Sequence, residues 1–111
     1  TTISALEEKR KLAAKSIVNY GFHFGATNDN IADIKKAKSI AAVKLYMDYT
    51  TGDLKVNDFD VIREIFQASR MTIVHAEDEN VKRNRKKNNG YDVVRRVSFV
   101  FVSYKSSGTV Q

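Results

Sequence analysis

The amino-acid sequence predicts an α/β fold built on a parallel sheet, and two observations support this prediction. Within residues 1–76, amphipathic segments alternate with strand-like segments in the order helix, strand, helix, strand, helix, strand. Such alternation is typical of βαβ units, in which helices pack outside parallel strands. Two of the strand-like segments are also nearly continuous apolar runs, as expected for strands that are buried on both faces.

The size and composition of the chain fit one small domain. It has 111 residues, of which 42% are hydrophobic and 29% charged, and single domains commonly contain about 100–150 residues. The chain has no cysteine, which excludes a disulfide framework and a thiolate metal site. No apolar run approaches the roughly 18–20 residues that span a bilayer, and the amino end lacks the pattern of a signal peptide. We therefore expect a cytoplasmic protein without membrane contact.

The net charge of +6 is distributed unevenly. Residues 1–81 contain eleven Lys or Arg and twelve Asp or Glu, whereas residues 82–111 contain eight Lys or Arg and one Asp. The basic excess therefore belongs to the last thirty residues, and it says little about the rest of the chain.

The amino-terminal half contains the signals of two helices and one strand. Ser4 and Glu7 have the spacing of a capping box, which predicts that a helix begins there. Residues 18–25 alternate apolar with small or polar residues, which predicts a strand. A turn over residues 27–30 then leads into a short helix over residues 31–40.

The central part predicts two further strands around one helix. Residues 42–47 form an apolar run that only Lys44 interrupts, and residues 71–76 form a second run that contains His75 near its end. Between them, residues 57–60 are typical of a helix start and precede an apolar stripe.

The carboxyl end departs from this pattern. Residues 81–89 predict a helix that is almost entirely polar, Gly90 predicts its end, and residues 93–104 predict a strand. We therefore divide the chain into residues 1–88 and a divergent basic extension, residues 89–111.

Lys44 and His75 are the residues that this pattern singles out for chemistry. An ammonium group in an apolar strand is costly unless it is paired or chemically changed; alternatively, the lysine extends its head group to the sheet edge. His75 lies near the carboxyl end of a strand, where ligands gather in parallel sheets, although a structural histidine is the alternative. His23, within an aromatic segment, is expected to be structural.

Three motifs in order carry a resemblance to a known family. They are VKLYM at residues 43–47, TTGDL at residues 50–54 and IVHAEDE at residues 73–79. Together they resemble the middle of the dihydroorotases, which belong with hydantoinases and dihydropyrimidinases to the cyclic amidohydrolases. The segment at residues 19–24, NYGFHF, is similar to the third barrel strand of the same group. The resemblance covers residues 3–88.

The resemblance implies a partial (β/α)8 TIM barrel with about three βα units, followed by the divergent helix and strand. It implies that Lys44 is carbamylated and bridges two zinc ions, and that His75 is a ligand of one of them. Tyr49 matches by spacing the tyrosine with which hydantoinases stabilise the oxyanion, although a tyrosine that only packs is equally compatible. The implied reaction is hydrolysis of the C–N bond of a cyclic amide such as dihydroorotate, a step of pyrimidine biosynthesis.

The chain also departs from the family. It has no His-x-His pair, and His23 and His75 are its two histidines, so most ligands of a two-metal centre are missing. A complete barrel takes about 250 residues. We therefore expect a fragment that is inactive by itself.

Other classes of function remain open at this stage. The basic run at residues 82–87, with Phe99, Phe101 and Tyr104 as stacking groups, is compatible with binding of nucleic acid. An open strand edge would instead suit a non-catalytic interaction module, which pairs as a homo-oligomer or with a complementing chain. The carboxyl end itself is either of foreign origin, through a frameshift, a truncated gene or a cloning boundary, or an element that caps a sheet edge.

Overall fold

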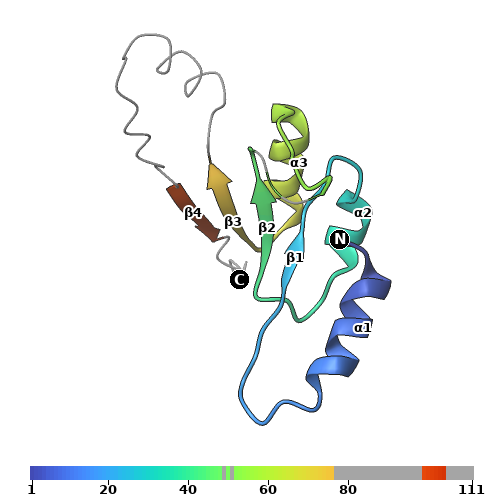
Figure 1. Ribbon diagram of the computed structural model, residues 1–111. Helices are drawn as coiled ribbons and strands as arrows, with labels where there is room; N and C mark the ends of the chain where they lie inside the picture. The colour runs from blue at the N-terminus through green and yellow to red at the C-terminus, as the bar shows by residue number, and fades with distance from the viewer. Residues whose placement is uncertain (49, 51, 77–98, 105–111) are drawn as a thin grey trace, which may run out of the picture.

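The computed structural model describes residues 1–48, 50 and 52–76, and the backbone of residues 99–104. These residues form one four-stranded sheet in the order β1-β2-β3-β4, with helices packed on one of its faces (Figure 1). The elements in chain order are α1 (Ile3–Ala13), β1 (His23–Gly25), α2 (Ile31–Lys36), β2 (Ala42–Tyr46), α3 (Phe59–Ala68), β3 (Met71–Ala76) and β4 (Phe99–Tyr104).

The sheet confirms the α/β class and its parallel strands. β1 pairs with β2 and β2 with β3, both in parallel, so spatial neighbours are also neighbours in the sequence. β4 pairs with β3 in the antiparallel direction, from Met71 opposite Tyr104 to Ala76 opposite Phe99. The strand expected over residues 93–104 is thus present in its described part. The extension assigned to residues 89–111 contributes a strand to the same sheet as residues 1–88.

The helix starts depend on local capping. The N-cap of α1 is Thr2, whose Oγ1 accepts a hydrogen bond from the backbone nitrogen of Ala5 at 3.2 Å. The capping box expected at Ser4 is therefore wrong, because the helix begins before that residue. α3 begins where expected, since Asp58 accepts hydrogen bonds from the backbone nitrogens of Asp60 and Val61.

Two expected elements are shorter in the structure than in the sequence pattern. The strand expected over residues 18–25 is reduced to β1, His23–Gly25, because its partner β2 begins only at Ala42. The helix expected over residues 31–40 ends at Lys36, after which Ala37 has an extended backbone.

The core lies between the helices and one face of the sheet. Phe24, Val43, Leu45 and Val74 point to this covered face, where Leu6, Ile34, Ile62 and Ile65 of the helices meet them. The strand residues of this set are between 0 and 3% exposed. Burial of such side chains contributes about 1.5–3 kcal/mol each, so this layer holds the sheet to its helices.

The opposite face, here called the open face, is not covered by the described helices. Lys44, Tyr46, Ile73 and His75 alternate with the core residues along β2 and β3, and all four are only partly buried. The expectation that β2 and β3 are buried on both faces is therefore wrong. Their apolar runs reflect one covered face together with large, half-exposed residues on the other.

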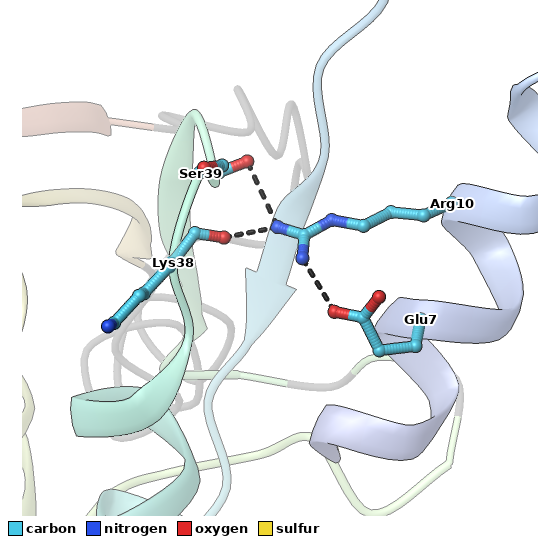
Figure 2. Close-up of polar contacts among 4 residues, drawn as sticks. All are labelled: Glu7, Arg10, Lys38 and Ser39. Carbon is cyan, nitrogen blue, oxygen red and sulfur yellow. Dashed lines mark hydrogen bonds and ion pairs between the residues drawn. The ribbon is translucent and has the colours of Figure 1, made fainter.

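α1 is attached to the loop between α2 and β2 by Arg10 (Figure 2). The Nη2 group of Arg10 donates to the backbone carbonyls of Lys38 and Ser39, and Nη1 pairs with Glu7 Oε1 at 2.6 Å. Ser39 has a left-handed backbone with a φ of 53°. The guanidinium therefore links α1 to the loop that follows α2.

Candidate functional site

Lys44, Tyr46 and His75 form a cluster on the open face of the sheet. Lys44 and Tyr46 lie two residues apart on β2 and share a face, and Tyr46 lies opposite His75 in the register of β2 and β3. The Tyr46 and His75 rings are stacked with their centroids 5.9 Å apart. Nζ of Lys44 lies 4.9 Å from the centroid of the Tyr46 ring. The structure therefore brings together the two residues that the sequence analysis selected, with Tyr46 between them.

The Lys44 amine lies in a setting that favours its neutral form. Desolvation by burial lowers the pKa of Lys44 from its usual value of 10.5, because the charged form loses hydration. No carboxylate of the described residues forms an ion pair with Lys44; instead, the ammonium group contacts the electron-rich face of Tyr46. β2 is an inner strand of the sheet, and the head group of Lys44 lies over the Tyr46 ring.

Gly25 and Ile73 flank Lys44 in the register of the three parallel strands. At Gly25 a Cβ atom would lie 3.2 Å from Cγ2 of Thr1 and 3.5 Å from Cδ2 of Leu54. The amino end of the chain and the loop after β2 therefore approach the open face beside Lys44. They narrow the space around the amine without covering it.

His75 is the next-to-last residue of β3, as the sequence pattern predicts. Its carbonyl accepts a hydrogen bond from the backbone nitrogen of Met47 at 3.0 Å, which extends the β2–β3 pairing beyond β2. This bond holds the His75 backbone at the end of the two strands where loops converge, and imidazole nitrogens there can bind a metal or move a proton.

The other selected residues are not part of this cluster. His23 lies at the start of β1 opposite Ala42, toward the other end of the strands from His75, and is exposed. Tyr49, the acidic residues 77–79, the predicted helix over residues 81–89 and the basic run at residues 82–87 lie outside the described residues.

Two residues near the site were missed by the sequence analysis. Tyr46 separates Lys44 from His75, and the carboxyl side chain of Asp48, just beyond β2, is only 4% exposed. The signal that could have found Tyr46 is the spacing of two residues from Lys44, which places both on one face of a strand. For Asp48, a carboxylate directly after an apolar strand is itself a reason for attention.

The donor atoms in the described residues do not complete a metal centre. In that part of the chain there is no group of three or more His, Cys, Asp or Glu side chains that could hold a metal ion. Zinc sites use about three or four protein ligands, whereas an imidazole and an uncarbamylated amine supply one good ligand. What the cluster offers on its own is an amine with a lowered pKa, which is a better nucleophile toward a carbonyl or CO2 carbon than an ordinary lysine.

A separate hollow of about 400 Å³ lies at the opposite end of the strands. It is lined mainly by small and apolar residues near the ends of α2 and α3 and the starts of β2 and β3, among them Ile34, Ala41, Ala42, Ala68 and Met71. Two helices end there, so their carbonyl groups disfavour an anion. Lys35 and Arg70 at its rim complement those helix ends.

A comparison of the chain with models of known protein families finds no match, and a search of curated proteins finds no similar sequence. Among the described residues, no helix is both long enough and apolar enough to cross a membrane.

Proposed function

We propose that this chain is a segment of a cyclic amidohydrolase barrel of the dihydroorotase type, and that Lys44 and His75 occupy two positions of its two-metal site. The observation that carries the proposal is their placement on one face of adjacent parallel strands, a face that the described helices do not cover. In a (β/α)8 barrel, helices cover the outer face of each strand and the other face lines the interior. An isolated segment would therefore present its interior residues on an open face.

The lowered pKa of Lys44 supports the role that the resemblance implies for it. The neutral amine can add to CO2: its nitrogen forms a bond to the carbon, one C=O π bond opens onto oxygen, and a proton leaves to water. The product is a carbamate anion, whose oxygens are hard donors suited to divalent metals. A protonated lysine cannot make this bond, so desolvation of Lys44 favours the modification.

The segment by itself is proposed to be inactive. Lys44 and His75 leave a metal short of ligands, and the reaction therefore requires residues that lie outside this set. Zinc and a ring substrate such as dihydroorotate accordingly belong to the parent enzyme. We expect purified chain to bind less than one zinc ion per molecule and to show no ring opening of dihydroorotate.

The proposal is tested by the chemistry of Lys44. The chain is incubated with ¹³C-bicarbonate and zinc, and carbamate is detected by ¹³C NMR. We expect a carbamate signal in the native chain that is lost in Lys44→Arg and kept in the matched control Lys36→Arg, which alters an exposed lysine of α2.

Two results would contradict this proposal. Absence of any Lys44-dependent carbamate, across a range of bicarbonate concentrations, would remove the proposed role of Lys44. Stoichiometric zinc with turnover of dihydroorotate by the chain alone would show that the site is complete rather than partial.

A further inference from the structure

Large apolar side chains are exposed on one flank of the molecule. They belong to the last turn of α1 and to the segment that joins α1 to β1, and they are Leu12 at 68% exposure, Ile17 at 101%, Val18 at 67% and Tyr20 at 51%. Figure 1 shows that α1 and this connection lie beyond β1, on the side of the sheet away from β4. We call these four residues the α1 flank. Several large apolar groups exposed within one short stretch of chain suit an interaction surface.

The segment that joins α1 to β1 has a strand pattern, but none of the described strands pairs with it before Phe22. Val18, Tyr20 and Phe22 alternate as in a strand, but pairing with the β2 side begins only at the Phe22 carbonyl, which accepts from Ala41 at 2.8 Å. Residues 16–22 contain no charged side chain, and the chain has no proline. Charges and prolines are the usual devices that block association at a sheet edge, and this segment has neither.

The exposed side of α1 has a charge pattern that is complementary to itself. Glu8 and Leu12 are four residues apart on α1, so they lie on one side of the helix. Lys15 follows Leu12 by three residues, in the turn just beyond the helix. All three are exposed, and neither Glu8 nor Lys15 forms an ion pair in the described part of the chain. If two such helices run antiparallel about a two-fold axis at Leu12, each Glu8 faces Lys15 of the other copy.

We propose that the α1 flank binds a second copy of this chain about a two-fold axis, with the two α1 helices antiparallel. The Leu12 side chains meet at the axis, two symmetric Glu8–Lys15 pairs border them, and Ile17, Val18 and Tyr20 become buried. The contact joins the same surface of both copies, so the two-fold axis closes the assembly as a dimer. The dimer does not depend on the proposed function, since none of its residues belongs to the Lys44–Tyr46–His75 cluster.

The first test measures the mass of the full chain by sedimentation equilibrium over a series of concentrations. We expect a monomer–dimer equilibrium in the native chain. Leu12→Asp places two carboxylates at the axis and should raise the dissociation constant by about tenfold or more. The matched control is Phe59→Asp, which changes another exposed apolar residue, at 73% exposure on α3, and should leave the dimer intact.

The second test examines the antiparallel arrangement by exchange of charges. Glu8→Lys or Lys15→Glu alone makes two symmetric pairs repulsive and should weaken the dimer by about fivefold. The double variant restores opposite charges and should return the dissociation constant to within about twofold of native. Circular dichroism confirms that each variant is folded.

Three results would overturn the proposal. These are a chain that stays monomeric at all concentrations, an assembly that grows beyond two copies, and a double variant as weak as the single ones. If the chain alone stays monomeric and a different protein binds the α1 flank, the proposal is also overturned.

Discussion

The two faces of β2 and β3 differ in what their residues do. Leu45 and Val43 point to the covered face and are 0% and 2% exposed, whereas Lys44 and Tyr46, their immediate neighbours, lie half-buried on the open face. The covered face carries aliphatic packing, and the open face carries an amine, a phenol and an imidazole in contact. Along one strand, every second residue therefore packs in the core, and the residues between them carry the reactive groups. The loss of stability caused by substitutions should alternate along the strand in the same way.

The largest expected effect follows from removing packing on the covered face. Leu45→Ala should reduce the free energy of unfolding by about 2–5 kcal/mol, because it leaves a cavity among fully buried neighbours. Ile73→Ala on the open face is the matched control and should cost less than half as much. Urea unfolding monitored by circular dichroism measures both, and equal losses would mean that the open face is packed as tightly as the covered one.

A smaller effect is expected from a buried hydroxyl pair where α3 leads into β3. Thr72 is 1% exposed, and its Oγ1 shares a hydrogen bond with Oγ of Ser69, which is 7% exposed. Thr72→Val should destabilise the fold by about 1–2 kcal/mol, because it leaves a buried hydroxyl without this partner. Ser69→Ala combined with Thr72→Val removes both hydroxyls and should recover part of the loss. Strictly additive losses would show that the pair contributes no coupling.

The smallest effect on stability is expected on the open face and depends on pH. Folding lowers the pKa of Lys44 below 10.5, so between the lowered value and 10.5 the unfolded chain holds more protons than the folded chain. The contribution of Lys44 to the free energy of unfolding should therefore rise with pH through that window. Below the window the amine is charged in both states, and the full cost of burying that charge lowers the stability of the fold. Lys44→Met should lack this rise, while changing stability at neutral pH by less than about 1 kcal/mol because solvent screens a half-buried group.

The measurement compares urea unfolding of the native chain and Lys44→Met from neutral to alkaline pH. Lys36→Met, an exposed lysine on α2, controls for the loss of one positive charge and should keep the native pH dependence. A native-like rise in Lys44→Met would assign the pH dependence to other groups.

The elements with strong local signals could be predicted from the sequence. β3 has the expected bounds, β2 is shorter by one residue, and α3 begins after Asp58. Their apolar runs and the N-cap aspartate act within a few residues, so no knowledge of the rest of the fold is needed. The position of His75 near a strand end was predictable for the same reason.

Features that depend on distant residues could not be read from local patterns. Both Thr2 and Ser4 can cap a helix, and the chain near Thr1 is fixed by Asn30, whose Nδ2 donates to the Thr1 carbonyl at 2.8 Å. The length of β1 depends on where β2 starts. The contact between Tyr46 and His75 depends on the register of β2 and β3, which side-chain alternation alone does not determine.

The order β1-β2-β3-β4 has a consequence for how the chain is made. Each strand after β1 pairs with the strand synthesised just before it, so it finds a partner that has already been made. A growing chain can therefore form its strand pairs in the order in which they are synthesised. Short delays between partner strands limit the time during which the apolar residues of β2 and β3 remain accessible to aggregation.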